Sequence, residues 1–247
     1  MPSLRRFAVV VVLGALPLLA GCAPQGLSQS ADGRVTRSLL TADPSSGQEF
    51  PAYAATATGG QVRVHQRPGG APGSTLTSPV ASGAPLTFLV VEQRGDWLEV
   101  LLPVRPNGST GWVLAEDVVV EGVPYRLDVR TAEHALDLYD GDRLVRTYPI
   151  GIGKRDTPTP GGTFYLKELL QPPNPDGEYG PYAYGLSGFS TTLDTFAGGE
   201  AVIGLHGTND AASIGSDVSF GCIRLRNADI TELAELLPLG TPVRILA

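Results

Sequence analysis

The stretch IGLHGT at residues 203–208, followed by SFGCIRL at residues 219–225, decides the chemistry and the fold of this 247-residue chain. Cys222 lies sixteen positions after His206. A thiolate is the nucleophile in cysteine chemistry, and a free thiol with a pKa of about 8.5 is mostly protonated at neutral pH. A nearby imidazole can either accept the thiol proton or hold a thiolate–imidazolium pair. The two stretches therefore predict a nucleophile, Cys222, and its general base, His206.

The residues around Cys222 suit acyl transfer. Gly221 allows a sharp backbone turn close to a substrate carbonyl. The amides around Gly221 and Cys222 are expected to form an oxyanion hole, whose loss typically costs about 100-fold or more in rate. The Arg224 guanidinium either holds a carboxylate or braces the loop. The full set expected to form the oxyanion hole or to contact substrate is Gly207, Ser219, Phe220, Gly221 and Arg224.

These flanks resemble the catalytic signature of the L,D-transpeptidases, the YkuD-type family. That family pairs an apolar-His-Gly-Thr stretch with a downstream Ser/Thr-His-Gly-Cys motif that is followed by apolar-Arg or apolar-Asn. The resemblance covers about Tyr125 to Ala247 and includes the turn TPTPGG at residues 157–162. One departure is Phe220, which stands where many members have a second histidine. His206 is therefore the single candidate base. Whatever a second imidazole contributes to substrate binding in other members is either absent here or replaced by the aromatic ring of Phe220.

The resemblance implies a two-step reaction on peptidoglycan. Cys222 attacks the carbonyl of the third residue of a stem peptide and releases terminal D-alanine, and the acyl-thioester then passes to a side-chain amine of a neighbouring stem. His206 takes the thiol proton, with its other ring nitrogen oriented by a carbonyl near Gly207. No metal or organic cofactor is needed, and the family implies covalent inhibition by carbapenem-type β-lactams.

The N-terminal end of the chain predicts export and a lipid anchor. Residues 1–21 read as a signal peptide, with Arg5 and Arg6 before an apolar stretch too short to span a bilayer. LAGC at residues 19–22 resembles a lipobox, which implies lipidation of Cys22; an ordinary secretory signal with an incidental cysteine is the alternative. Residues 22–58 read as a flexible tether. The expected location is the cell envelope, outside the cytoplasm and anchored to a membrane, where a retained free thiol at Cys222 suggests a chemical use.

Residues 59–121 show short apolar runs separated by turn residues. Three stretches resemble a bacterial SH3-like domain: VRV at 62–64, GDWLEV at 95–100 and GWV at 111–113. The resemblance implies a small barrel that either binds cell-wall peptide or positions its neighbour. Trp97 and Trp112 are expected to pack in the core or on a hairpin rather than to stack on a ligand, and His65 is expected to be structural or exposed.

Residues 122–247 form the predicted catalytic domain. Asp140-Gly141 marks a hairpin, and a helix with Asn227 as its N-cap is expected near the C-terminus. The segment 168–190 is either a lid over the substrate or an ordinary connection, and His134 is expected to be structural or exposed. The fold class predicted is mainly β: a small SH3-like barrel, then a β-sandwich-like catalytic domain with one short C-terminal helix.

Other functions fit the sequence less well. The net charge is −7 with scattered basic residues, so nucleic-acid binding is not expected. Papain-like wall hydrolases place the cysteine before the histidine, and sortases use a longer gap and a Thr-x-Thr-Cys motif. The alternatives that stay open are a wall-peptide L,D-carboxypeptidase and a non-catalytic peptidoglycan-binding lipoprotein. The prediction is a peptidoglycan L,D-transpeptidase.

Overall fold

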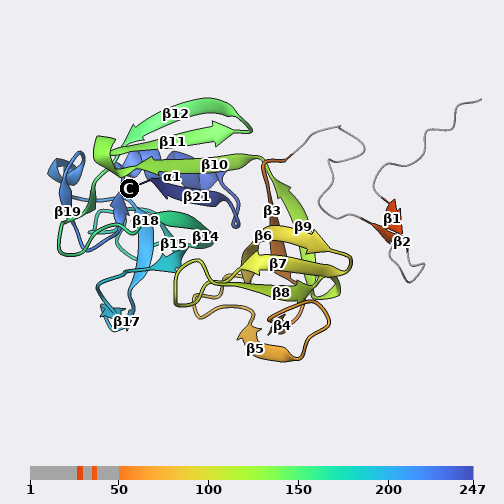
Figure 1. Ribbon diagram of the computed structural model, residues 1–247. Coiled ribbons are helices and arrows are strands. Elements are labelled where there is room, and N and C mark those ends of the chain that lie inside the picture. The colour runs from red at the N-terminus through yellow and green to blue at the C-terminus, as the bar shows by residue number, and fades with distance from the viewer. Residues whose placement is uncertain (1–26, 30–34, 38–49, 247) are drawn as a thin grey trace, which may run out of the picture.

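The computed structural model describes residues 27–29, 35–37 and 50–246. Within these ranges the chain is mainly β, as predicted, with one α-helix (Figure 1). A short antiparallel pair, β1 (Leu27–Gln29) and β2 (Val35–Arg37), stands apart from two larger sheets. The predicted signal peptide, Cys22 and most of the predicted tether lie outside the described residues. None of the helices in the described ranges has the length and apolar character needed to cross a membrane.

The N-terminal sheet has seven antiparallel strands in the order β5-β4-β8-β7-β6-β3-β9. They are β3 (Ala52–Ala57), β4 (Gln61–His65), β5 (Pro72–Thr77), β6 (Thr87–Arg94), β7 (Trp97–Leu101), β8 (Thr110–Leu114) and β9 (Val118–Val123). Alternating strand positions bury a compact core that includes Val62, Phe88 and Leu98. β3 begins before residue 59 and β9 ends after residue 121, so this sheet extends beyond both predicted bounds.

The tryptophans and His65 pack within this sheet. Trp112 is buried, and the His65 ring meets the Trp97 ring edge-on with centroids 4.8 Å apart. His65 Nδ1 lies 2.7 Å from the carbonyl oxygen of Gly70. These contacts agree with the packing roles predicted for the three side chains.

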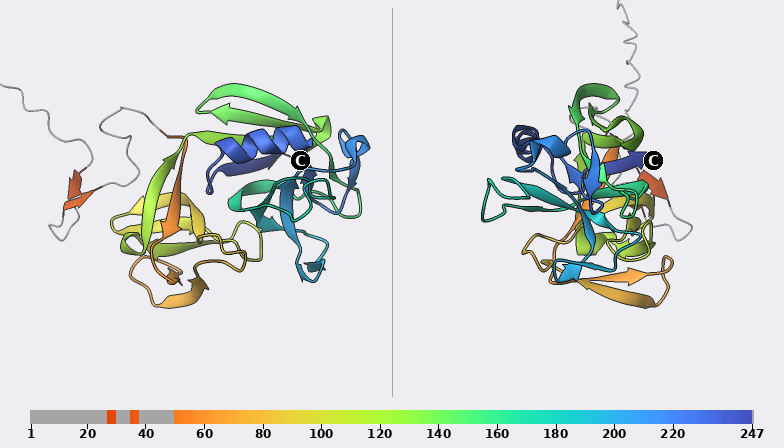
Figure 2. Two further views of the ribbon diagram at one scale, coloured as in Figure 1. Left: turned by 180° about the vertical axis from the view of Figure 1, so that it is seen from behind. Right: turned by 90° about the vertical axis from the view of Figure 1, so that its left-hand side faces the viewer.

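The C-terminal sheet has eight strands in the order β12-β11-β10-β21-β14-β15-β18-β20 and curls around its core (Figures 1 and 2). They are β10 (Tyr125–Arg130), β11 (Ala135–Asp140), β12 (Arg143–Pro149), β14 (Gly162–Leu170), β15 (Ala183–Phe189), β18 (Val202–His206), β20 (Ile223–Arg224) and β21 (Pro242–Leu246). The sheet is mixed, because β10 runs parallel to β21 and β18 parallel to β20. Two small pairs accompany it: β13 (Ile152–Gly153) with β19 (Asp217–Ser219), and β16 (Thr195–Phe196) with β17 (Gly199–Glu200).

The helix α1 (Asn227–Leu236) buries Ile230 and Leu233 in the core of this sheet. The predicted N-cap at Asn227 is wrong: Arg226 is the cap residue, without a side-chain bond, and Asn227 is the first helical residue. The reason is tertiary, because the Asn227 amide oxygen accepts a hydrogen bond from the amide of Thr208 instead.

The segment 168–190 is less irregular than its Pro and Gly content suggests. β14 runs to Leu170 and β15 spans Ala183–Phe189, so only residues 171–182 and Ser190 of this segment lie outside strands. The sequence LKELL at 166–170 favours helix by propensity, but pairing with β15 on one side places it in the sheet.

The two large sheets pack directly on each other. Tyr165 of β14 is fully buried in a cluster with Leu89 and Leu101 of the N-terminal sheet. At Gly240, an added Cβ would lie 2.4 Å from the Cβ of Ala54. This close approach fixes the N-terminal sheet against the sheet that carries the histidine and the cysteine.

Candidate active site

Strands β18 and β20 bring His206 and Cys222 together. They pair in parallel, with Leu205 opposite Ile223 and His206 opposite Arg224. The amide of Gly204 donates to Cys222 Sγ at 3.3 Å. A Cβ on Gly204 would lie 3.5 Å from both Cys222 Sγ and His206 Cδ2, so the thiol and the imidazole flank one small residue. The pair that the sequence predicted is therefore assembled across neighbouring strands.

His206 is held as a neutral imidazole. Its side chain is buried, and Nδ1 lies 2.6 Å from the carbonyl oxygen of Gly207. A carbonyl only accepts, so Nδ1 carries the proton and Nε2 is left with its lone pair. Burial lowers the pKa of His206 to about 4, helped by the positive charge of Arg224 and opposed by the bond to Gly207. The imidazole is therefore uncharged at neutral pH.

Cys222 is held as a neutral thiol. Burial raises its pKa, and this outweighs the lowering by the Gly204 amide and by the Arg224 charge. With a raised thiol pKa and a lowered imidazole pKa, the resting pair is thiol and imidazole. Of the two possibilities that the sequence left open, the burial of both groups favours proton acceptance over a stable thiolate–imidazolium pair.

The loop before Cys222 is braced by Ser219. Its hydroxyl donates to the Cys222 carbonyl oxygen at 2.6 Å and accepts from the Gly221 amide at 3.1 Å. Gly221 has a φ of 116°, a conformation that side-chain-bearing residues rarely adopt. Ser219 is itself buried, and both of its side-chain hydrogen bonds go to the loop that carries Cys222.

The TPTPGG turn braces the same loop from the other side. Thr157 Oγ1 donates to the carbonyl oxygen of Ser219 at 3.1 Å. Thr159 Oγ1 donates to the carbonyl oxygen of Gly221 at 2.9 Å and accepts from the amide of Gly153 at 2.9 Å. The sequence predicts only a rigid turn here, because nothing in its local pattern shows that both hydroxyls reach a loop sixty residues away.

Asn227 supports the loop after His206. Its Oδ1 accepts from the Thr208 amide at 2.9 Å. An added Cβ at Gly207 or at Gly180 would lie 2.4 Å from this oxygen, so both positions require glycine. Gly207 therefore accepts the hydrogen bond of His206 Nδ1 and also packs closely against Asn227 Oδ1. Asn227 thus supports the site, whereas its place in the sequence predicted only a helix cap.

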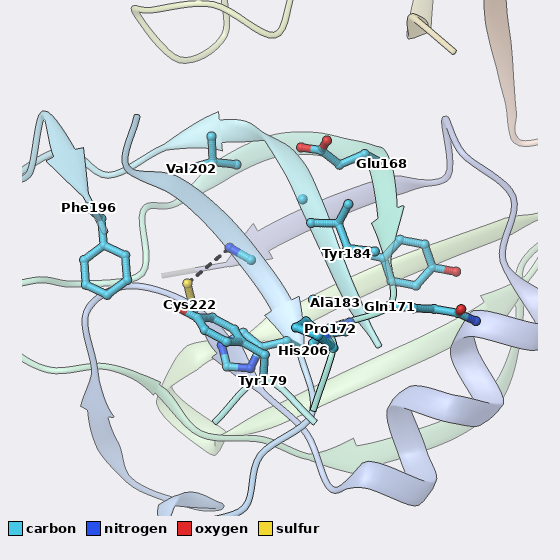
Figure 3. Close-up of a pocket in the computed structure, with 14 residues that line it drawn as sticks. Glu168, Gln171, Pro172, Tyr179, Ala183, Tyr184, Phe196, Val202, His206 and Cys222 are labelled. Carbon is cyan, nitrogen blue, oxygen red and sulfur yellow. Dashed lines mark hydrogen bonds between the residues drawn. The ribbon is translucent and has the colours of Figure 1, made fainter. Parts of the chain in front are cut away.

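A cavity of about 470 Å³ opens beside the thiol and the imidazole (Figure 3). The Tyr179 ring lies 4.9 Å from the His206 ring, and Phe196 and Glu168 lie on other sides of the cavity. Most of the remaining wall is apolar and consists of Leu170, Pro172, Pro173, Ala183, Tyr184 and Val202. Four residues of the segment 168–190, which was expected to be either a lid or an ordinary connection, face this cavity from its irregular part: Gln171, Pro172, Pro173 and Tyr179.

Arg224 and Phe220 line a smaller recess next to Cys222. The Arg224 side chain is mostly buried, and its Nε has no hydrogen-bond partner in the described part of the chain. Phe220 is about half exposed, and its ring lies 5.6 Å from the Phe196 ring and 4.3 Å from Lys154 Nζ. The recess is therefore lined by the Arg224 guanidinium, the carboxyl side chain of Glu178 and the rings of Phe196 and Phe220.

His134 lies apart from this site, with Nε2 2.6 Å from Asp217 Oδ1. Within residues 50–246, no three His, Cys, Asp or Glu side chains gather in an arrangement that would hold a metal ion.

A neutral thiol beside a buried neutral imidazole, at the edge of an apolar cavity, is the arrangement of a cysteine-dependent acyl-transfer enzyme. Residues 124–245 match the model of the L,D-transpeptidase catalytic domain, YkuD. The chain belongs to this family of cysteine-dependent acyltransferases.

The family relationship extends over most of the chain. YkuD of Bacillus licheniformis is 38% identical over 181 residues, which cover 70% of this chain and 94% of the relative. YkuD of Bacillus subtilis is 35% identical over 176 residues, which cover 69% of this chain and 98% of the relative. Among solved structures, L,D-transpeptidase 3 from Mycobacterium tuberculosis in complex with a faropenem-derived adduct matches with 12% identity and a TM-score of 0.45, over 86% of this chain and 90% of that one.

Proposed function

We propose that this chain is a peptidoglycan L,D-transpeptidase that links the third-position residues of neighbouring stem peptides. The observation that carries the proposal is the placement of Cys222 Sγ and the His206 ring around Gly204 at the edge of the apolar cavity. The cavity has the volume of a small-ligand site and is large enough for part of a peptide.

In the first step, Cys222 Sγ attacks the carbonyl carbon of the third stem residue while its proton moves to His206 Nε2. The Gly221 amide is engaged with Ser219 Oγ, so we assign the oxyanion to the amide of Cys222. The carbon–nitrogen bond to D-alanine then breaks, and the proton on Nε2 goes to the departing amine. Arg224, in the adjoining recess, is placed to hold the carboxylate of that D-alanine.

In the second step, a side-chain amine of the acceptor stem attacks the thioester. His206 Nε2 takes a proton from the amine, and the sulfur leaves as the thiol after receiving it. The product is a new amide bond between two stems, and the enzyme returns to its neutral pair. Water in place of the amine would give the L,D-carboxypeptidase reaction, which an apolar cavity wall disfavours by limiting the access of water.

The proposal includes the setting of the enzyme. We assign the N-terminal sheet to the bacterial SH3-like class, and residues 1–22 to a signal peptide and lipidated Cys22 that hold the protein at the cell envelope. Mass analysis of the membrane fraction with and without Cys22→Ala tests the anchor. We further propose that carbapenem-type β-lactams acylate Cys222, with a mass increase equal to that of the intact drug as the expected result.

The function is tested with a chain beginning at Phe50, which contains both large sheets whole. It is incubated with a donor tetrapeptide and an amine acceptor and followed by intact-mass and product-mass measurement, alongside Cys222→Ala and His206→Ala. Loss of D-alanine with a cross-linked product, absent in Cys222→Ala, is the expected result. Release of D-alanine without cross-linking would indicate the carboxypeptidase, and no turnover or acyl adduct from folded protein would indicate a wall-binding protein.

A further inference from the structure

We infer that the N-terminal sheet builds one wall of the active site: Arg105, in its β7–β8 loop, is a positioning residue that holds the β16–β17 hairpin and its Phe196 against the Cys222 cavity. The inference deepens the proposed transpeptidase function and rests on it for the identity of the substrate. It gives the N-terminal sheet a role that does not depend on binding peptidoglycan.

The β16–β17 hairpin has little packing of its own. Each strand has two residues, joined by a turn in which Ala197 and Gly198 both have positive φ. All residues from Asp194 to Glu200 are exposed, and the hairpin projects from the body of the protein (Figures 1 and 2). An isolated two-stranded hairpin is marginally stable in water, so contacts at its base must set its orientation.

The N-terminal sheet provides those contacts. Arg105 Nη1 donates to the carbonyl oxygen of Ser190 at 2.8 Å, and Nη2 donates to that of Leu193 at 3.0 Å. Its guanidinium also lies 4.9 Å from the Phe189 ring centroid. Asn107 adds a reciprocal pair, donating to the Phe189 carbonyl at 2.8 Å and accepting from the Phe189 amide at 2.9 Å.

These bonds close the base of the hairpin. Ser190 pairs its amide with the carbonyl of Ala201 at 2.8 Å, and Ser190 Oγ accepts from the amide of Leu193 at 3.1 Å. Arg105 therefore binds the two carbonyls at the corner where the chain leaves β15. One planar guanidinium spanning both carbonyls fixes the direction in which the hairpin leaves the sheet.

The support itself is rigid. The N-terminal sheet packs on the C-terminal sheet through the Tyr165 cluster and through the close contact between Gly240 and Ala54. The β7–β8 loop is thereby fixed relative to β18 and β20. The β7–β8 loop would therefore not move together with the hairpin. A displacement of the hairpin would instead have to break the hydrogen bonds of Arg105 and Asn107.

The consequence for the site follows from Phe196. Its ring lines the cavity with Cys222 and contacts the ring of Phe220, two residues before the nucleophile. Loss of the Arg105 hydrogen bonds would allow the hairpin and its Phe196 ring to move while the contacts of Cys222 and His206 stay unchanged. We expect weaker donor binding, with KM of Arg105→Ala raised about tenfold and kcat changed less, since small misplacements far from the chemistry have effects of this order or more.

The test uses the full-length chain as wild type, Arg105→Ala, Arg105→Lys and the control Arg94→Ala. Arg94 is an exposed arginine of the same sheet that pairs with Glu92 and has no contact with the hairpin. Amide hydrogen exchange of peptides covering 191–201 should be faster than in wild type in Arg105→Ala and unchanged in Arg94→Ala. It should be intermediate in Arg105→Lys, because lysine keeps the charge but cannot donate to both carbonyls in the way that the guanidinium does. Unchanged exchange in Arg105→Ala would overturn the inference whether or not the protein is a transpeptidase.

A double-mutant cycle with Phe196→Ala separates positioning from general destabilisation. If Arg105 acts through the hairpin, Arg105→Ala should add little to the KM effect in the Phe196→Ala background. Full additivity of the two KM effects would mean that Arg105 does not act through Phe196 and would refute the inference. A wild type that turns over no stem peptide would refute the proposed function and leave hydrogen exchange as the deciding measurement for the wall.

Discussion

The Nδ1 atom of His206 lies 2.6 Å from the carbonyl oxygen of Gly207, the next residue in the chain. This bond fixes the tautomer of the His206 imidazole through a backbone carbonyl rather than a carboxylate. Because the carbonyl belongs to the same loop, anything that moves the loop also turns the imidazole. The orientation of the base thus depends on what holds residues 207 and 208.

Asn227 is the first residue on which this orientation depends. Asn227→Ala removes the acceptor of the Thr208 amide and the oxygen packed on Gly207, so kcat should fall about tenfold or more because the base is misaligned. Asn227→Asp keeps an oxygen at the same place and should retain most of the activity. Steady-state kinetics and thermal melting of both variants test this. Equal losses in the two would contradict the assigned role of Oδ1.

The neutral resting pair predicts a specific pH profile for thiol alkylation. Because burial raises the pKa of Cys222, its rate of reaction with iodoacetamide should keep rising above pH 8.5, the ordinary pKa of a free cysteine. At pH 7 it should be slower than that of free cysteine. The chain beginning at Phe50 contains Cys222 as its only cysteine, so the total alkylation rate reports on it alone. A reactivity plateau between pH 5 and 8, lost in His206→Gln, would instead indicate a thiolate–imidazolium pair.

His206 should also make stability depend on pH. Its folded pKa of about 4 lies below the ordinary value of about 6.5, so the unfolded chain binds a proton at a pH where the folded chain does not. The neutral His206 side chain therefore makes its full contribution to the free energy of unfolding above pH 6.5. As the pH falls to 4, the free energy of unfolding decreases by about 3 kcal/mol. Urea unfolding of wild type and His206→Gln at pH 7, 5.5 and 4 measures it, because carboxylate effects occur in both proteins. Parallel stability curves for the two would show that the imidazole does not titrate in this way.

Thr159 should be essential for the shape of the cysteine loop. Thr159→Val keeps the volume but leaves the Gly153 amide and the Gly221 carbonyl without their buried partner, which should cost about 3 kcal/mol of the free energy of unfolding. The activity of the folded fraction should also fall, because Gly221 directly precedes Cys222, the proposed nucleophile. Thr163→Val, at an exposed position on β14, is the matched control and should change stability by no more than about 0.5 kcal/mol. Similar effects of the two substitutions would argue against the bracing role.

Local sequence patterns predicted the mainly β fold and pointed to Cys222 and His206, which the structure places close together. Strand alternation and turn residues located several strands in each of the two large sheets, since both are properties of a few adjacent residues. The motif around Cys222 was readable because its residues resemble a known catalytic signature and because a cysteine with a histidine at this spacing is chemically distinctive. The predictions were wrong for residues whose partners are distant in the sequence. Asn227 was interpreted as a helix cap, and residues 168–170 and 183–189 were interpreted as irregular although they form strands.

The sequence by itself determined that this protein pairs a cysteine with a histidine in a mainly β chain of the L,D-transpeptidase family. Only the tertiary structure decided that the thiol and the imidazole are both neutral at rest, since burial is a property of the packed core. It also decided that Thr159, Asn227 and Arg105 support the site, because each acts through a hydrogen bond to a segment far away in the chain. Such contacts arise when strands from different parts of the sequence pack together, and no local spacing records them.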